Sequence, residues 1–328
     1  MGVLKVQPPR NFSLFKEQEL EVLCFEAFGT ACKVKFSPLD SINHESASQK
    51  IVSWVHCFEE RYSRYLPESW LSKINEAAGK YSLKSTPEDF QLLQAATFSN
   101  FHSQGVIDPS CLPLTKLWQE AKRIGQIPEE SKIQHAVELV SWEKVQFSKD
   151  EIFLPLQGMG LDFGGFGKEF AVDKVAEILK SISCENFLVD FGGDLFASGS
   201  ASEHCSWKVG IERTGGSERP AFVIFLKDHA LATSGNYRKF FDFRGRRYGH
   251  TIDCRTGYPT IYSERSASVI SPSCLKSGVL STTSLMIGKQ EALQLLNSEW
   301  NVEGCIQSFD SSQLTDKFYK YIVHENLL

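Results

Sequence analysis

The chain has 328 residues, enough to bury one large hydrophobic core or two medium ones, and its 42% hydrophobic and 23% charged residues are those of an ordinary globular protein. This composition excludes an intrinsically disordered chain, and no apolar run is long enough to serve as a membrane segment. The formal net charge of −5, with basic residues scattered along the chain, argues against a nucleic-acid partner.

The cysteines and the opening residues indicate the cellular compartment. Nine cysteines, an odd number without a Cys-x-x-Cys pair, predict mostly free thiols rather than a disulfide framework or a zinc site. Residues 1–15 lack the apolar stretch of about 7 to 15 residues that an export signal needs. We therefore expect a cytoplasmic protein, unless an export segment has been removed from this sequence.

The N-terminal region is expected to begin with a flexible lead-in. Residues 1–18 contain two consecutive prolines, which cannot donate backbone hydrogen bonds, and they show no periodic pattern. We expect order to begin near Leu20, with a single domain over residues 19–328. Between residues 20 and 36, β-favouring residues on both sides of Gly29 predict two paired strands with a turn at the glycine.

The rest of the first half is predicted to be mainly helical. Apolar residues recur at helical spacing between residues 47 and 62. Thr86 is followed by a proline and two acidic residues, which is typical of a helix N-cap. The predicted helices cover residues 47–62, 69–78, 86–102, 112–124 and 130–140.

The second half is predicted to mix helices and strands. Strand-like composition over residues 144–156 leads to a glycine-rich segment, from which a helix is expected over residues 164–180. Strands are expected at residues 186–191, 207–212 and 221–227. No internal repeat or linker marks a domain boundary, so the pattern indicates one mixed arrangement of helices and strands.

Four segments place polar side chains next to glycines and turns. They are residues 161–173, residues 187–196, residues 231–237 with 248–259, and residues 271–288. In the first, three glycines lie between Asp162 and Lys168 at the expected start of a helix, where backbone N–H groups and the helix dipole favour an anion such as phosphate. A tight strand-to-helix turn explains the same spacing about as well.

The other three segments also have structural interpretations when each is taken alone. An apolar strand running into Gly192, Gly193 and Asp194 is typical of a strand that ends in a turn. His250 brings a titratable imidazole into a region rich in hydroxyl groups, although a histidine in such a loop more often has a structural role. The small hydroxyl residues of the segment 271–288 suit the packing of an apolar helix.

Taken together and in this order, the segments resemble the ApbE-type FAD:protein FMN transferases. The resemblance runs from Ala27 to Gly288 and includes Phe28-Gly29-Thr30, where the family usually has Met-Gly-Thr. The family's Ser-x-Tyr-x-Pro-x-Ser-x-x-Ser-x-x-Asn pattern matches Ser63 to Asn75, and its Gly-x-x-Asp-Pro pattern matches Gly105 to Pro109.

The resemblance implies an α+β fold with mixed sheets and flanking helices around an FAD cleft. It further implies an enzyme that cleaves the FAD pyrophosphate with the help of Mg²⁺ and transfers FMN to a Thr or Ser hydroxyl of an acceptor protein, with release of AMP. A cation that bridges the phosphates would neutralise the charge that develops there. FAD and an acceptor protein are therefore the expected partners.

The resemblance also implies site residues. The positions that match family contacts to FAD are Phe28, Tyr65, Asp108, Asp162, Lys168 and Ile252. The metal ligands are expected from the backbone carbonyl of Gly165 and the hydroxyl groups of Ser281 and Thr282, and hard oxygen ligands suit magnesium. His250 matches a motif position whose role is orientation or proton transfer.

Two residues depart from the family pattern. The family's metal segment reads Ala-Asp-Ala-Leu-Ser-Thr, but here Gly278 stands where the acidic ligand is expected, which weakens the predicted metal site. The family usually has Gly after the lysine, whereas here Glu169 follows Lys168 and is a hypothetical replacement for the missing carboxylate. Two alternatives to an active transferase stay open: an FAD-binding protein with lost or weakened metal chemistry, and an FAD pyrophosphatase that releases FMN and AMP.

Overall fold

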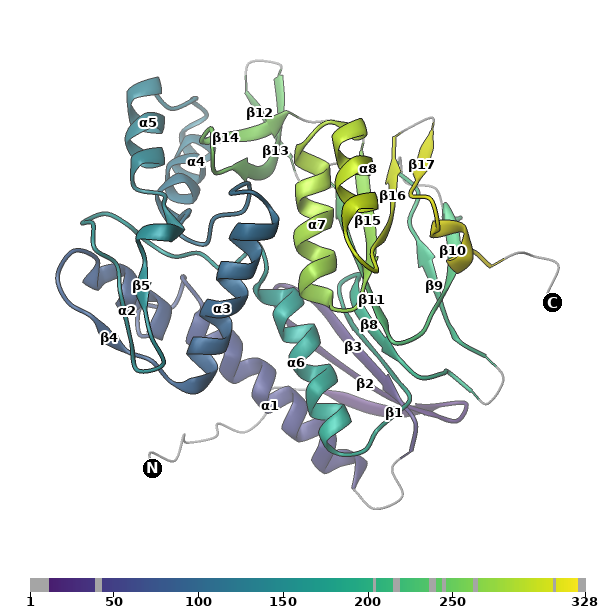
Figure 1. The fold of residues 1–328 in the computed structure, drawn as a ribbon. Coiled ribbons are helices and arrows are strands. Elements are labelled where there is room, and N and C mark those ends of the chain that lie inside the picture. The colour runs from purple at the N-terminus through teal and green to yellow at the C-terminus, as the bar shows by residue number, and fades with distance from the viewer. Residues whose placement is uncertain are drawn as a thin grey trace.

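The computed structural model describes residues 12–38, 43–202, 205–214, 219–235, 240–243, 246–261, 265–308 and 311–323. Its elements form an α+β fold in which helices lie against one long antiparallel sheet, as Figure 1 shows. The expected fold class is confirmed.

The long sheet contains strands from both ends of the chain. Its strands, in spatial order, are β1 (Ser13–Glu17), β2 (Leu20–Ala27), β3 (Thr30–Phe36), β7 (Phe187–Phe191), β8 (Asp194–Ser198), β11 (His229–Gly235), β15 (Ser266–Ser271), β16 (Glu303–Gln307) and β17 (Ser312–Leu314). Each neighbouring pair is antiparallel. The expected hairpin around Gly29 is the β2–β3 pair, with both Phe28 and Gly29 at positive φ in its turn.

The helices occupy two regions. The α-helices are α1 (His44–Tyr62), α2 (Trp70–Ala77), α3 (Pro87–His102), α4 (Leu112–Ile124), α5 (Glu130–Glu138), α6 (Gly167–Ser181), α7 (Cys274–Met286) and α8 (Lys289–Ser298), with short 3-10 turns η1 (Trp142–Lys144) and η2 (Phe318–Tyr321). Helices α1, α6, α7 and α8 pack against strands of the long sheet, while α4 and α5 pair with each other away from it (Figure 1).

Buried and more exposed side chains alternate along β2, and the buried ones face the helices that cover one side of the long sheet. On β2, Leu23, Phe25 and Ala27 are buried in the main core together with the apolar side of α1, whereas Glu26 between them is exposed. This is the period of two that a strand needs to place alternate side chains on opposite faces.

The other face of the sheet is covered by a separate hairpin. Strands β9 (Trp207–Ile211) and β10 (Phe222–Leu226) pair with each other and bury their apolar side chains with those of β8, β11 and η2. Phe318 from η2 is fully buried in this second core. Side chains of β8 and β11 thus contribute to cores on both sides of the sheet.

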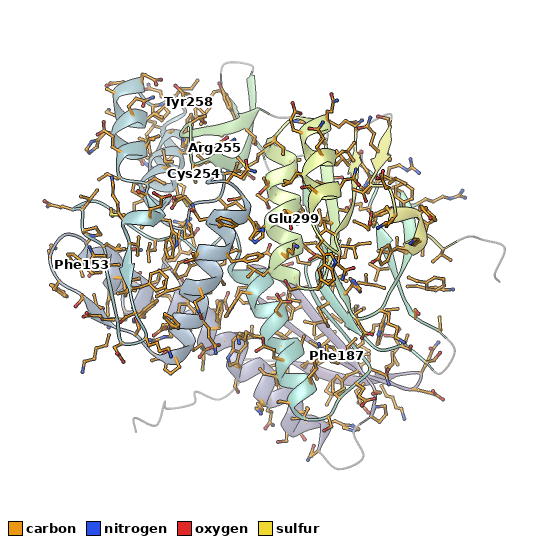
Figure 2. The ribbon with its side chains drawn as sticks, in the orientation of Figure 1. Phe153, Phe187, Cys254, Arg255, Tyr258 and Glu299 are labelled. Carbon is orange, nitrogen blue, oxygen red and sulfur yellow. The ribbon has the colours of Figure 1, made fainter. Side chains whose placement is uncertain are left out.

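Two small sheets complete the fold. One contains β4 (Leu83–Lys84), β5 (Gln146–Phe147) and β6 (Glu151–Phe153), and the other contains β12 (Phe240–Phe243), β13 (Arg246–Asp253) and β14 (Tyr258–Ile261). The turn between β13 and β14 docks on α4, because Trp118 Nε1 donates a hydrogen bond of 2.7 Å to the carbonyl of Gly257. In Figure 2, Cys254, Arg255 and Tyr258 lie beside α4 and α5 at the upper end of the molecule.

The N-terminus of α3 is stabilised by a buried acidic residue. Thr86 is the N-cap, as expected, and its hydroxyl and the carboxylate of Asp89 form a reciprocal capping box. Asp89 also accepts hydrogen bonds from Arg61 Nε at 2.7 Å and from the Tyr62 hydroxyl at 2.6 Å. Burial opposes ionisation of Asp89, but the donors from Arg61, Tyr62 and Thr86 outweigh it and hold its pKa below the usual value.

One expectation for the N-terminus needs correction. Residues 1–18 were expected as a flexible lead-in, but Ser13–Glu17 forms β1 and pairs with β2 through five residue pairs, from Ser13 with Cys24 to Glu17 with Leu20. The strand was not predicted because its side chains are mostly exposed and so carry no apolar pattern. Residues 1–11 lie outside the described part of the chain.

The structure also bears on the cysteines and on membrane-spanning helices. All nine cysteines are free thiols. In the part of the chain that the structure describes, none of the helices is both long and apolar enough to cross a membrane.

Candidate active site

The glycine-rich segment before α6 is held by side chains from just before α2 and within it. The side-chain amide of Asn75 donates to the carbonyl of Leu161 at 3.0 Å, and its oxygen accepts the Leu161 N–H at 2.6 Å. Arg64 Nε lies 3.0 Å from Asp162 Oδ2, while the other oxygen of Asp162 accepts the N–H of Gly164. The two expected motif segments therefore meet.

The turn over residues 105–109 joins the same region. The Asp162 N–H donates to the carbonyl of Pro109 at 2.9 Å. The N–H of Cys254, in the β13–β14 turn, donates to the carbonyl of Val106 at 3.3 Å. This turn thus links the glycine-rich segment to the segment that contains His250.

Asp108 has a structural role in that turn. Its side chain is buried, and Oδ1 accepts hydrogen bonds from the N–H and the hydroxyl of Ser110 at 2.8 and 2.6 Å. Oδ2 accepts from the Asn100 amide at 3.2 Å and from the Trp142 N–H at 3.1 Å. Both oxygens are therefore engaged within the protein.

Lys168, in the first turn of α6, is tied to the turn that follows β7. Its ammonium group donates to the carbonyl of Phe191 at 3.0 Å and forms an ion pair with Asp194. Burial opposes the charge of Lys168, but the nearby carboxylates of Glu169 and Asp194 outweigh it and raise the pKa of Lys168 above its usual value. Lys168 is therefore a firmly charged cation at neutral pH.

Asp194 and β11 extend these contacts to α7. The other oxygen of Asp194 accepts the N–H of Thr233 at 3.3 Å. The next residue, Ser234, has its hydroxyl 2.9 Å from the Ser281 hydroxyl and 2.8 Å from the Thr282 hydroxyl. The two expected hydroxyl ligands of a metal thus lie side by side and share a third hydroxyl.

Glu169 and Gly278 face each other where α6 contacts α7. A Cβ atom built on Gly278 would lie 2.5 Å from Glu169 Cγ and 3.1 Å from Glu169 Oε1. Such distances are too short for any side chain at position 278 unless Glu169 moves. The Glu169 side chain therefore occupies the space that a side chain on Gly278 would need.

The carboxyl group of Glu169 is in an unfavourable environment. Burial and the neighbouring negative charge of Asp194 raise its pKa to about 8, although the charge of Lys168 acts in the opposite direction. Oε2 is buried and accepts no hydrogen bond. Buried polar atoms normally have a partner, so this oxygen calls for one that the protein itself does not supply, such as a water molecule or an ion.

Asp173, at the C-terminal end of the glycine-rich segment, fixes the start of α7. Its two oxygens accept the N–H groups of Cys274 at 2.7 Å and Leu275 at 2.9 Å. These are free donors at the first turn of α7, so the carboxylate caps a helix from a distant part of the chain. The contact holds α6 and α7 in the relative position that brings Glu169 to Gly278.

Asp173 should make stability depend on pH. Burial raises its pKa to about 6, with the amides of Leu275 and Cys274 opposing this. The folded state then binds more protons than the unfolded state, where Asp has a pKa of about 3.9, so stability falls as pH rises from about 4 to 6. We expect this loss, about 3 kcal/mol, to disappear in Asp173→Asn when urea unfolding of both proteins is followed from pH 4 to 7. Parallel pH curves for the two proteins would contradict it.

The remaining expected FAD contacts differ in exposure. Tyr65 is 73% exposed, and its ring lies against the guanidinium of Arg64, whose carbon is 4.2 Å from the ring centroid. Phe28 has a φ of +55° and is held by a hydrogen bond of 2.8 Å from its N–H to Glu59. Tyr65 therefore presents an exposed ring with Arg64 over it, whereas Phe28 is held by its backbone and by ring contacts with Phe58 and Phe191.

The last two expected residues lie on β13. Ile252 is half-buried against the cluster that contains Trp118 and Tyr248. His250 lies in the same strand, but its side chain is outside the described residues.

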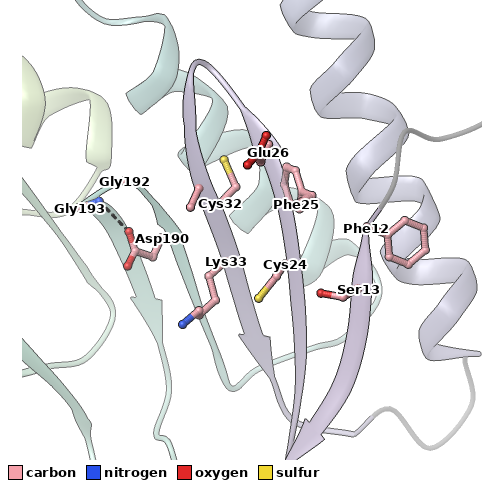
Figure 3. A pocket seen from close by; sticks show the side chains of 11 residues that line it. Phe12, Ser13, Cys24, Phe25, Glu26, Cys32, Lys33, Asp190, Gly192 and Gly193 are labelled. Carbon is pink, nitrogen blue, oxygen red and sulfur yellow. Dashed lines mark hydrogen bonds between the residues drawn. The ribbon is translucent and has the colours of Figure 1, made fainter.

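One hollow on the surface lies away from these contacts. It has a volume of about 610 Å³ and opens over β2 and β3 beside the β7–β8 turn, as Figure 3 shows. Its lining includes Lys33, Asp190, Gly192 and Gly193, but none of the residues expected to contact FAD or a metal. We therefore place the candidate site at the junction of α6, β11 and α7, on the evidence of the side-chain contacts.

The donor atoms at this junction suit a hard cation. Among the described residues, no group of three or more His, Cys, Asp or Glu side chains is placed to hold one metal ion. Serine and threonine hydroxyls and one unpaired carboxylate oxygen are available instead. Oxygen donors of this kind fit Mg²⁺ and do not fit a soft metal.

Three residues of the site were not predicted from the sequence. Arg64 lies at an unspecified position of the motif over Ser63 to Asn75, and Ser234 lies in the singled-out segment 231–237, but neither residue was assigned a role. Asp173 was included in a glycine-rich segment without a role, because its partners on α7 are 101 and 102 residues away. The one sequence signal for this capping role is that Asp173 is an acidic residue among the apolar residues of the predicted helix.

A family model and curated relatives match the chain. The model described as the ApbE family matches residues 28–306. The FAD:protein FMN transferase of Haemophilus influenzae is 28% identical over 291 residues, covering 85% of this chain and 84% of the relative. That of Treponema pallidum is 27% identical over 285 residues, covering 82% and 79%.

Solved structures show the same fold. The ApbE protein of Thermotoga maritima superposes with a TM-score of 0.83 at 23% identity, covering 93% of this chain and 100% of that one. The flavin transferase ApbE of Vibrio cholerae superposes with a TM-score of 0.80 at 21% identity, covering 95% and 100%. The likeness extends over nearly the whole chain.

Proposed function

The chain belongs to the ApbE family, and we propose from this premise that it is an FAD:protein FMN transferase. In the reaction, the bond between the two phosphates of FAD breaks and an ester bond forms between the FMN phosphorus and a Thr or Ser hydroxyl oxygen of an acceptor protein. AMP leaves, and a base takes the hydroxyl proton. The relatives that carry this activity in their names support the proposal.

One structural observation carries the proposal: segments far apart in the sequence converge on one junction. Lys168 contacts Asp194, Asp194 contacts Thr233, and the neighbouring Ser234 contacts Ser281 and Thr282. A cation, the N-terminus of α6 and hydroxyl groups are thereby placed together, and these are groups that suit recognition of a diphosphate.

We assign FAD contacts to the residues expected from the sequence. The exposed ring of Tyr65 suits stacking on the flavin, and the charge of Lys168 suits a phosphate. Phe28, Asp162 and Ile252 complete the side-chain contacts. Asp108 is the exception: each of its carboxylate oxygens accepts two hydrogen bonds within the protein, so it serves to shape its turn.

The residues present also fit a divalent cation. The carbonyl of Gly165 and the hydroxyls of Ser281 and Thr282 are the proposed ligands, and the shared contact of the two hydroxyls with Ser234 supports Ser281 and Thr282. When bound, Mg²⁺ would neutralise the charge that develops on the diphosphate. Ser234 orients the two hydroxyls, and His250 is proposed to orient the acceptor or take its proton.

Direct assay tests the proposed function. The purified protein, FAD, Mg²⁺ and a candidate acceptor are incubated, and we expect covalent flavin fluorescence on the acceptor together with an equal amount of AMP. Bound FAD without turnover would instead indicate a flavin-binding protein, and AMP without acceptor would indicate an FAD pyrophosphatase.

The expected cytoplasmic location stays a prediction from the sequence.

A further inference from the structure

We propose that Glu169 supplies the acidic ligand of the divalent-cation site, with its carboxylate placed by α6 in the space left open by Gly278 on α7. What the cation does in the reaction rests on the proposed function, but the site itself is argued from the geometry of this chain.

The first observation is that the Glu169 side chain fills the space beside Gly278. With a Cβ on Gly278 only 2.5 Å from Glu169 Cγ, a side chain at position 278 would force the Glu169 side chain to move.

The second observation is the unpaired oxygen. Glu169 Oε2 is buried and accepts no hydrogen bond, which is costly for a carboxylate. Two of the three N–H groups of the neighbouring Lys168 ammonium are directed at Phe191 and Asp194 instead. A bound cation would satisfy the free oxygen of Glu169.

The third observation is the donors on α7. Gly278, Ser281 and Thr282 are spaced by three and four residues, so they share one face of the helix. The Ser281 hydroxyl donates to the carbonyl of Gly278 at 3.0 Å, which ties it to the residue that Glu169 contacts. The residue that Glu169 contacts and the two hydroxyls therefore lie on one face of α7, where a cation could take the carboxylate and the neutral hydroxyl oxygens as ligands.

Direct titration with Mn²⁺ tests the assignment without any catalytic readout. Mn²⁺ takes oxygen ligands as Mg²⁺ does, and its free fraction is measured from its electron paramagnetic resonance signal. We expect Glu169→Gln to weaken Mn²⁺ binding at least tenfold, because even residues behind a metal ligand typically contribute about 10-fold to 100-fold to affinity. Glu177→Gln, on the exposed side of the same helix, is the matched control and should bind Mn²⁺ like the unmodified protein.

Moving the carboxylate from position 169 to position 278 by substitution provides the second test. Gly278→Asp alone should lower the melting temperature, because its side chain meets Glu169. Glu169→Gly combined with Gly278→Asp removes the clash and returns a carboxylate to the same volume from the other helix. We expect the double variant to have a higher melting temperature than Gly278→Asp alone. Its Mn²⁺ affinity should be within about threefold of that of the unmodified protein.

The outcomes separate this inference from the proposed function. Equal Mn²⁺ affinity in the unmodified protein and Glu169→Gln, or no Mn²⁺ binding by either, overturns the assignment even if flavin transfer is observed. Glu169-dependent Mn²⁺ binding by a protein that transfers no flavin supports the cation site and rejects the transferase.

Discussion

Replacing Lys168 with methionine should destabilise the protein by roughly 3–5 kcal/mol, because the change leaves the buried carboxylate of Asp194 without its cation. Asp194 would lose its ion pair and Glu169 its nearest positive charge, while the carbonyl of Phe191 would lose a donor. Urea unfolding at pH 7 measures the loss. The same variant should bind FAD about 10-fold to 100-fold more weakly in a fluorescence titration, since a charge-assisted contact to phosphate contributes about 1.5–3 kcal/mol.

Two further variants show whether charge is the cause. Lys174→Met removes a lysine from the same helix, where it pairs with the exposed Glu177, and should change stability by no more than about 1 kcal/mol. Lys168→Met combined with Asp194→Asn should be more stable than Lys168→Met alone, because the uncompensated charge is reduced. Independent, additive effects of the two substitutions would show that the ion pair does not stabilise the fold.

Replacing Asp89 with alanine should have a similar effect, roughly 3–5 kcal/mol. The carboxylate is buried and accepts hydrogen bonds from Arg61, Tyr62 and Thr86, so its removal leaves one cation and two donors without their acceptor. Urea unfolding at pH 7 measures this loss. Asp150→Ala, at an exposed position, should change stability by less than about 0.5 kcal/mol.

The effect of Asp89 should also depend on pH in a defined direction. Its pKa is lowered in the folded state, so its contribution is present above the pKa of an unfolded Asp, about 3.9, and is lost as pH falls through the folded value. The difference in stability between the unmodified protein and Asp89→Asn should therefore shrink below about pH 4. A difference that stays constant down to pH 2 would contradict this account.

Local signals explain why much of the fold could be predicted. The β2–β3 hairpin was predicted from β-favouring residues around Gly29, and α4 begins and ends at the predicted residues, Leu112 and Ile124. The N-cap of α3 was predicted at Thr86, because the hydroxyl and the acidic residue three positions later are close in sequence. By contrast, β1 is mostly exposed and carries no apolar period.

The candidate site could be predicted only in part. The sequence order of its motifs identified Lys168, Ser281 and Thr282, and the structure brings their segments to one junction. The contribution of Ser234 and the capping of α7 by Asp173 were missed, because nothing in a linear pattern records which residues of separate elements face each other.

The sequence by itself determined the family, the α+β class and the boundaries of most helices, because periodicity, capping and turn chemistry act between residues that are neighbours along the chain. It also showed that Gly278 lacks the expected carboxylate and that Glu169 is an added one. Only the tertiary structure decided that these two departures belong together, because the packing of α6 against α7 places Glu169 in the volume above Gly278. The physical reason is exclusion: two side chains cannot fill one space, so a glycine on one helix permits a carboxylate from the other.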